Sequence, residues 1–382
     1  DPMFVAGKKD YGYFAISAYQ LGKVAICLQP ARGYNLDPKS TYHDPDLVPP
    51  HNYLAFYAWI QKKFMANAII HFGKHGNLEW LPGKALGLSN VCYPEVTLGP
   101  LPNLYPFIVN DPGEGTQAKR RSSAVIIDHL TPPLTRAESY GPLAELELLV
   151  DEYYEASGVD PRRLRILRTE ILTLCSSTGI DSDCGIDKEM KEEIALERLD
   201  NYLCELKEMQ IRDGLHIFGV TPHGKLLTNL LVALVRVPRG DGKDEDASLL
   251  RAMADDLGLD FDPLDCVMST VWDGPKPRVL EKKGTWRSNG DTVERLEELA
   301  YELVLGSKKI KSNWVNTSLV MENLNRNIRP AVEKCGKAEL AGLLGGLEGR
   351  FVEPGPSGAP TRGRPEVIPT GRNFYSVDTR MV

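Results

Sequence analysis

The sequence lacks any close pairing of cysteines. The seven cysteines are scattered and odd in number, and none belongs to a C-x-x-C pair; they occupy positions 27, 92, 175, 184, 204, 266 and 335. This spacing argues against a zinc ribbon or a redox dithiol, because both need closely spaced thiols. Scattered single cysteines suit a reducing compartment better than a disulfide framework, so we expect a cytoplasmic protein.

The chain of 382 residues also lacks long apolar runs and an excess of positive charge. No run approaches the roughly 20 residues of a membrane span, and the net charge is -7. Neither a membrane protein nor a nucleic-acid-binding protein is indicated. The start, Asp1-Pro2-Met3-Phe4, shows no leader pattern, and neither end resembles a natural terminus, so we expect a piece of a longer protein.

No complete nucleotide-binding loop is present. Residues 219–225 match the first part of a Walker A motif, but Leu226 stands where Ser or Thr would bind magnesium. Pro222 also removes one of the backbone N–H groups that hold phosphate in such a loop. We therefore expect any ATP-driven function to need a partner protein.

The first part of the chain has the alternating pattern of an α/β protein. Residues 23–29 and 68–70 are short apolar runs typical of buried strands, and residues 53–65 between them have helix-forming composition. Strand, helix and strand in this order predict a βαβ unit and hence a parallel sheet. Further strands are predicted at residues 105–109 and 125–128.

A helical pattern replaces this alternation after about residue 140. Helices are predicted at residues 141–156, 161–177, 187–210, 224–237, 247–257, 291–305 and 316–334. The predicted fold class is therefore α/β, with a parallel-sheet portion joined to a largely α-helical domain in a larger multi-domain subunit. We expect three parts: an α/β portion at 1–140, a mainly helical domain at 141–345, and a Gly/Pro/Arg-rich segment at 346–382 that packs back on the active site.

Two histidines and a carboxylate follow the predicted strand at residues 68–70. His71, His75 and Glu79 lie in a loop at the carboxyl end of that strand, where open parallel sheets bind ligands. Imidazole and carboxylate groups can hold a divalent metal or accept a proton. The glycines between them would let other groups approach closely. The alternative is that His71 ends a strand in the core and that Glu79 is a solvated surface residue.

A second cluster, at residues 110–121, combines glycines with three consecutive basic residues. We expect a short helix here with Thr116 as its N-cap. Glycines before a helix N-terminus can form an anion site, which Lys119, Arg120 and Arg121 would strengthen. The alternative is a solvated charged turn.

A third group consists of arginines, most of them in the last segment. Guanidinium groups suit carboxylates and phosphates, which they bind through two parallel hydrogen bonds. The members are Arg350, Arg362, Arg364 and Arg372, joined by Arg32 and Arg136 from earlier in the chain. The alternative for the last segment is a basic disordered linker.

Several blocks of the sequence closely resemble the family shared by the cobaltochelatase large subunit and the magnesium chelatase H subunit. They are residues 29–34, 42–51, 71–84, 110–121, 130–138 and 349–378. The resemblance runs from about residue 22 to the end and is thinnest between residues 180 and 345. Gly-Lys-His-Gly-Asn-Leu-Glu-Trp-Leu-Pro-Gly-Lys at residues 73–84 is similar to the cobalt enzymes. Magnesium enzymes tend towards Gly-Thr-His-Gly-Ser-Leu-Glu-Phe-Met-Pro-Gly-Lys.

The resemblance implies an enzyme that forms nitrogen–metal bonds. The implied reaction is ATP-dependent insertion of Co²⁺ into hydrogenobyrinic acid a,c-diamide, a late step of aerobic cobalamin synthesis. ATP and Mg²⁺ would be used by two partner subunits, an AAA+ ATPase (CobS) and its companion (CobT), and not by this chain.

What metalation requires suggests roles for these residues, since water must leave the metal and protons must leave the ring nitrogens. Glu79 would be the base or the metal-delivering carboxylate, and His71 and His75 would be transient metal ligands. Basic side chains would clamp the carboxylates on the rim of the corrin ring. The candidates are Arg32, Lys74, Lys84, Lys119, Arg120, Arg121, Arg136, Arg362, Arg364 and Arg372.

Three alternatives to this function stay open. The first is a magnesium chelatase H subunit that acts on protoporphyrin IX. The second is a tetrapyrrole-binding protein without catalytic activity. The third is a chelatase for nickel or another metal, because histidine and carboxylate sites discriminate poorly among late first-row divalent ions.

Overall fold

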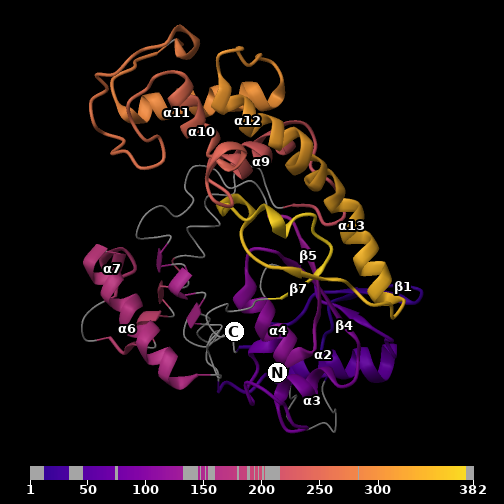
Figure 1. The fold of residues 1–382 in the computed structure, drawn as a ribbon. Coiled ribbons are helices and arrows are strands. Elements are labelled where there is room, and N and C mark those ends of the chain that lie inside the picture. Colours follow the sequence, from indigo (N-terminus) through magenta and orange to yellow (C-terminus); the bar gives the residue numbers. More distant parts are fainter. Residues whose placement is uncertain are drawn as a thin grey trace.

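A computed structural model describes residues 13–33, 46–73, 76–131, 216–282 and 284–375, together with parts of 145–202. The described chain combines a three-stranded parallel sheet with many helices (Figure 1). The predicted α/β fold class with a largely helical continuation is therefore confirmed. Among these residues, no helix has both the length and the apolar character needed to cross a bilayer.

The parallel sheet contains strands in chain order, β3 (Ile69–Ile70), β4 (Asn103–Ile108) and β5 (Val125–His129). Parallel neighbours need crossover connections, and here these contain α3 (Tyr93–Leu98) and α4 (Pro112–Ser122). Three of the strands predicted from apolar runs are thus confirmed. Their carboxyl ends form one edge of the sheet, from which the loops that begin at residues 71, 109 and 130 emerge.

The first predicted strand belongs to a different structure. Within the apolar run at residues 23–29, β2 (Val24–Cys27) pairs antiparallel with β1 (Ala18–Leu21) in a hairpin, outside the parallel sheet. Val24 and Ile26 are 60% and 61% exposed, so the prediction of a buried strand was wrong. An apolar run indicates a strand but does not tell which element covers it.

Helix α2 (His51–Ala58) continues into a π-helical turn, η1 (Trp59–Phe64), and together they account for the predicted helix at residues 53–65. Buried aromatic side chains of α2 pack against the loop that follows β3 and against the end of α3. These apolar contacts hold that loop in place beneath the sheet edge. The members of this cluster are Tyr53, Phe56, Tyr57, Ile60, Leu78, Leu81 and Leu98.

The rest of the chain is mainly helical, as predicted. The helices after the sheet are α6 (Pro161–Thr178), α7 (Ile180–Asp183), α9 (Gly224–Arg236), α10 (Leu249–Asp256), α11 (Asn289–Leu305), α12 (Val315–Asn323) and α13 (Arg329–Leu347), with the short turns η3 (Asp244–Asp246), η4 (Arg278–Leu280) and η5 (Leu324–Ile328). A core shared by α9 to α13 also includes Val109 and Leu130 from the sheet edge. The helices predicted at residues 141–156 and 187–210 lie largely outside the described residues.

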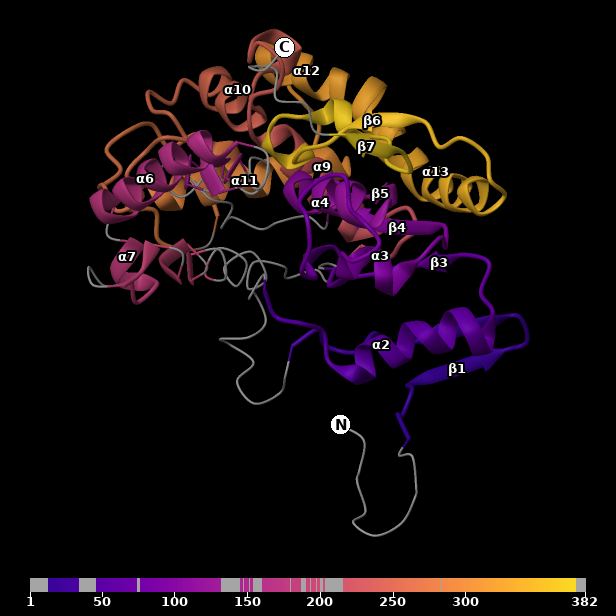
Figure 2. The same ribbon diagram turned by 90° about the horizontal axis from the view of Figure 1, so that it is seen from below.

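In its described part, residues 346–375, the Gly/Pro/Arg-rich segment is folded and is not a disordered linker. It forms β6 (Pro354–Pro356) and β7 (Asn373–Tyr375), which pair in parallel, and the turns η6 (Pro360–Arg362) and η7 (Pro365–Val367). Asp128 of β5 exchanges backbone hydrogen bonds with this segment: its N–H donates to the Arg372 carbonyl and its carbonyl accepts from Gly371 N–H. Figure 2 shows β7 beside β5, and α13 also packs directly against β5.

Candidate active site

Glu79 is buried beside the carboxyl edge of the sheet. It lies in the short turn η2 (Leu78–Trp80), in the loop that follows β3, and is only 3% exposed. The alternative of a solvated surface carboxylate was therefore wrong. Gly76 makes this burial possible, because a Cβ at position 76 would lie 2.0 Å from Glu79 Oε1. Only glycine permits such a close approach.

A second carboxylate, Glu114, approaches Gly76 from the other side. It lies in the first turn of α4 and is 8% exposed. Its Oε1 accepts a hydrogen bond from Gly76 N–H at 2.6 Å. Glu79 and Glu114, from two different connections of the sheet, are thereby brought together around one glycine.

The N-terminus of α4 differs from the prediction. The N-cap is Asp111, whose carboxylate accepts from Glu114 N–H, and Pro112 occupies the first helical position, which tolerates proline. Thr116 is already inside the helix, where its hydroxyl donates to the Pro112 carbonyl at 2.7 Å. The predicted N-cap was wrong because the helix begins five residues earlier than predicted and places Glu114 in its first turn.

The environment of Glu79 favours the protonated form of its carboxyl group. The pKa of Glu79 is raised to about 8, first by burial and then by the charge of Glu114, against a lowering by Arg32. A carboxyl group with such a pKa can take up or release a proton near neutral pH. Its Oε1 makes no hydrogen bond of normal geometry with the residues that the structure describes, although the Tyr105 hydroxyl lies close enough to lower the pKa of the carboxyl group.

His71 is held by hydrogen bonds at both ring nitrogens. Nδ1 lies 2.7 Å from Asn103 Oδ1, and Nε2 lies 2.8 Å from the Tyr57 hydroxyl. The amide group of Asn103 donates to the Ser122 carbonyl, so Asn103 Oδ1 must accept and His71 Nδ1 carries the proton. Nε2 therefore accepts from Tyr57.

The protonation state of His71 follows from its surroundings. Burial lowers the pKa of His71, against a smaller rise from the Asn103 hydrogen bond, and the ring is neutral at physiological pH. The expectation that His71 ends a strand in the core matches this position. A metal ion at Nε2 would have to displace the hydroxyl group of Tyr57.

Polar side chains that sequence reasoning missed extend this network. Gln29 donates to the hydroxyls of Tyr53 and Tyr57 at 3.1 and 2.6 Å, and it accepts from Asn77 Nδ2 at 3.2 Å. The chain of bonds thus runs from His71 to the residue two positions before Glu79. None of these residues is distinguished by charge or spacing, and only the fold brings them together.

Two of the predicted substrate-binding arginines hold the Glu79 loop. Arg121 donates to three backbone carbonyls, those of Glu79 at 2.6 Å, Leu81 at 2.7 Å and Lys84 at 3.1 Å. Arg32 is buried and donates to the Trp80 carbonyl at 2.7 Å. Lys84 is exposed. Arg32 and Arg121 thus fix the backbone at the candidate carboxylate and in the residues that follow it.

Other predicted basic residues gather around the C-terminal segment. Lys119 donates to Asn373, and Arg372 donates to the Glu366 carbonyl at 3.1 Å. Arg364 is exposed and pairs with the Glu366 carboxylate at 2.8 Å. Arg120 and Arg362 are half-buried, each with polar or ring contacts of its own.

Three of the predicted site residues, Lys74, His75 and Arg136, lie outside the described residues. Within the described part of the chain, no group of three or more His, Cys, Asp and Glu side chains is arranged to hold a metal ion. The metal set of His71, His75 and Glu79 therefore stays a prediction.

Known proteins match the whole length of this chain. The family described as CobN/Magnesium Chelatase matches residues 2–382. The aerobic cobaltochelatase subunit CobN of a Sinorhizobium species is 61% identical over 402 residues, which cover 100% of this chain and 31% of that protein. The magnesium-chelatase subunit ChlH of Oryza sativa subsp. indica is 29% identical, over 95% of this chain and 28% of that protein.

A solved structure supports the same relationship. The catalytic subunit of cobaltochelatase from Mycobacterium tuberculosis superposes with a TM-score of 0.60 at 40% sequence identity, over 94% of this chain and 30% of that one. This chain thus spans about a third of the length of the relatives that it matches. Matched over almost all of its residues, the chain belongs to the CobN/magnesium chelatase family.

Proposed function

We propose that this chain is part of the large, ring-binding subunit of an aerobic cobaltochelatase, a cytoplasmic enzyme of cobalamin synthesis. The reaction is insertion of Co²⁺ into hydrogenobyrinic acid a,c-diamide, driven by ATP hydrolysis in the partner subunits CobS and CobT. The buried carboxyl of Glu79 carries this proposal, because its pKa near 8 lets it exchange a proton near neutral pH and its Oε1 makes no hydrogen bond of normal geometry with a described residue.

The proposed chemistry follows from what metalation requires. A ring nitrogen must lose its proton before it can form a bond to Co²⁺, and a group that accepts this proton must itself be ionised. Glu79 accepts the proton and returns it to solvent, and Arg32 and Arg121 keep its backbone fixed during the exchange. His71 supports this arrangement through Tyr57 and Gln29 and need not contact the metal.

Basic side chains supply binding energy for the substrate. Corrin carboxylates attract arginine and lysine, and several attachment points fix the orientation of the ring. The exposed Lys84 and Arg364 are suited to this role. Lys74, His75, Arg120, Arg136, Arg362 and Arg372 remain proposed site residues on the evidence of their sequence blocks.

Cobalt is favoured over magnesium by the similarity to relatives. The Sinorhizobium cobaltochelatase subunit is 61% identical to this chain, whereas the Oryza magnesium-chelatase subunit is 29% identical. Higher sequence identity to the cobaltochelatase subunit is expected if this chain and that subunit act on the same substrate.

The proposed function is tested by Glu79→Gln in the full-length subunit, reconstituted with its ATPase partners. The amide keeps the size of the side chain but cannot accept the ring proton, so cobalt insertion should fall at least about a hundredfold. The dissociation constant of the corrin should change less than about twofold. Glu322→Gln, on the exposed face of α12, is the matched control. Lost corrin binding in Glu79→Gln, or unchanged insertion, would contradict the assignment.

A further inference from the structure

Three aromatic rings form a column at the carboxyl edge of the sheet. The ring of Phe72 lies parallel to that of His129, with 1° between the planes and 6.4 Å between centroids. His129 in turn stacks on His216, at 25° and 5.8 Å. Phe218 meets both Phe72 and His129 edge-on, with interplanar angles of 89°. Offset stacks and perpendicular contacts are the arrangements that aromatic quadrupoles favour.

The buried end of the column is anchored to α13. Glu339 is fully buried and accepts hydrogen bonds from His216 Nε2 at 3.0 Å and Gly219 N–H at 2.7 Å. It also accepts from Leu130 N–H at 3.2 Å and from the Thr370 hydroxyl at 2.7 Å. Burial acts to raise the pKa of Glu339, but these donors, led by His216, hold it below its usual value. The carboxylate therefore fixes His216 in place.

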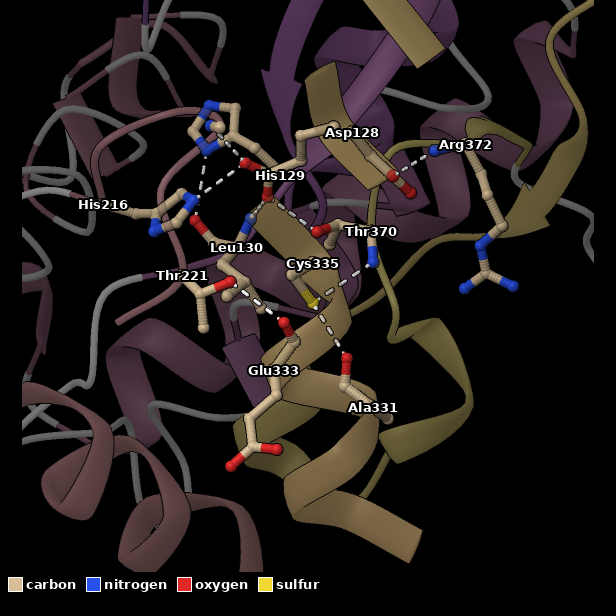
Figure 3. Close-up of polar contacts among 12 residues, drawn as sticks. Asp128, His129, Leu130, His216, Thr221, Ala331, Glu333, Cys335, Thr370 and Arg372 are labelled. Atoms are coloured by element: carbon tan, nitrogen blue, oxygen red, sulfur yellow. Dashed lines mark hydrogen bonds and ion pairs between the residues drawn. The ribbon is translucent and has the colours of Figure 1, made fainter. Parts of the chain in front are cut away.

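The middle ring, His129, is a neutral spacer. Burial lowers its pKa to about 4, so the ring carries no charge at physiological pH. Its Nδ1 donates to the Leu130 carbonyl at 3.1 Å, which sets the ring plane. Figure 3 shows His129 and His216 next to each other, beside Leu130 and Thr370. What His129 contributes is a flat surface and not a charge.

The other end of the column is open to solvent. Phe72 is 64% exposed, although it directly follows the half-buried His71. In extended backbone, consecutive side chains point to opposite sides. His71 thus faces Tyr57, and Phe72 faces His129. Phe72 thus offers a flat aromatic face, held in place by its neighbours, at the sheet edge where such folds bind ligands.

We propose that the exposed face of Phe72 is a stacking platform for the tetrapyrrole macrocycle, and that His129, His216 and Glu339 position this platform. This inference rests on the proposed function and names a residue that would orient the ring. A conjugated macrocycle offers a wide π face, and one aromatic ring stacked against it suits such a ligand better than it suits a peptide or a phosphate. The ring would then lie over the same sheet edge as Glu79.

The platform is tested with Phe72→Ala and Phe72→Trp in the full-length subunit, by titration with hydrogenobyrinic acid a,c-diamide and measurement of tryptophan quenching. Phe72→Ala should raise the dissociation constant about tenfold, because it removes the stacked ring. Phe72→Trp keeps an aromatic face and should bind within about threefold of the wild type. Phe351→Ala removes another exposed phenylalanine, 78% exposed after α13, and should leave binding unchanged.

The outcomes separate this inference from the proposed function. If the wild-type subunit binds the corrin and Phe72→Ala binds it equally well, the platform is overturned and the function stands. If the wild-type subunit does not bind the corrin at all, both are overturned.

The positioning role is tested by comparison of His129→Ala with His129→Phe. Because the column needs a flat ring at this position, His129→Ala should weaken corrin binding and His129→Phe should restore it. Melting temperatures report whether each variant is folded. A folded His129→Phe variant that binds as weakly as His129→Ala would show that the imidazole nitrogens matter, and the column would be overturned.

Discussion

The carboxyl groups of Glu79 and Glu114 both contact Gly76, and their closeness contributes to the raised pKa of Glu79. Gly76 leaves room for the Glu79 carboxyl and donates its N–H to Glu114, so the distance between the two acids is fixed by backbone contacts. Burial is the larger cause of the raised pKa of Glu79, and the charge of Glu114 is the next. Replacement of Glu114 therefore separates these two effects.

Glu114→Gln should shift the pH dependence of cobalt insertion to lower pH. In the wild type the reaction needs ionised Glu79, so its rate should rise with pH through a midpoint near 8. The glutamine can still accept from Gly76 N–H but carries no charge, so the pKa of Glu79 falls and the midpoint moves down by about one unit. Single-turnover insertion measured from pH 6 to 9.5 checks this.

The control for this prediction is Glu322→Gln on α12, which removes an exposed charge of the same kind. Its pH profile should match that of the wild type. An unchanged midpoint in Glu114→Gln would mean either that Glu79 is not the base or that Glu114 does not influence it. The double variant Glu79→Gln/Glu114→Gln should show no pH midpoint for cobalt insertion, because Glu79→Gln alone should remove the insertion activity.

Among the secondary-structure elements, α4 depends on close packing against β7. A Cβ at Gly115 would lie 2.3 Å from Phe374 Cζ, far inside normal contact distance. Helix propensity alone favours alanine over glycine by about 1 kcal/mol. Overpacking of a core costs about 1–3 kcal/mol, and the overlap here falls on a buried ring, so the steric cost is the larger effect.

Gly115→Ala should therefore lower the free energy of unfolding, measured by denaturant titration. Phe374→Leu makes room at the same position, so the double variant should be more stable than the sum of the two single changes predicts. Gly345→Ala on α13 is the matched control, because its nearest neighbour is Arg350 Nη2 at 3.7 Å, an ordinary contact. A Gly115→Ala variant as stable as Gly345→Ala would contradict this account.

Comparison of the predicted and observed strands shows which features of the fold could be predicted from the sequence alone. Apolar runs located β4 and β5 because their residues are largely buried on both faces and read as continuous apolar segments. The run at β3 also located a strand, although Ile70 is 41% exposed. The same signal misplaced β2, since a run of the same composition is exposed in the hairpin. Strand identity could be predicted, but burial depends on neighbours that are distant in sequence.

Some residues of the candidate site could be predicted from the sequence and others could not. Glu79 could be predicted because it follows a strand in a distinctive block. Glu114 could not, since a glutamate in the first turn of a helix is an ordinary feature that favours the helix dipole. Its role depends on Gly76, 38 positions earlier, and that contact exists only in the folded chain. Phe72 and His129 were missed for the same reason.

At the scale of the whole molecule, the hairpin of β1 and β2 exposes a row of large apolar side chains. Tyr19, Leu21, Val24 and Ile26 lie on one face, as paired partners Tyr19–Ile26 and Leu21–Val24, and each is more than half exposed. A two-stranded hairpin is at best marginally stable in water without a covering layer. Because this chain spans 31% of its Sinorhizobium relative, the remaining part of such a longer subunit can provide that layer.

We therefore expect the hairpin face to be covered in the full-length subunit. Ile26→Cys should react with a maleimide at least about tenfold more slowly than Lys243→Cys, which places a cysteine at an exposed loop position. The rate is measured by mass spectrometry, which assigns label to each cysteine separately from the native ones. Equal rates would show that the hairpin is exposed in the complete protein, and its apolar face would then have to meet a partner subunit instead.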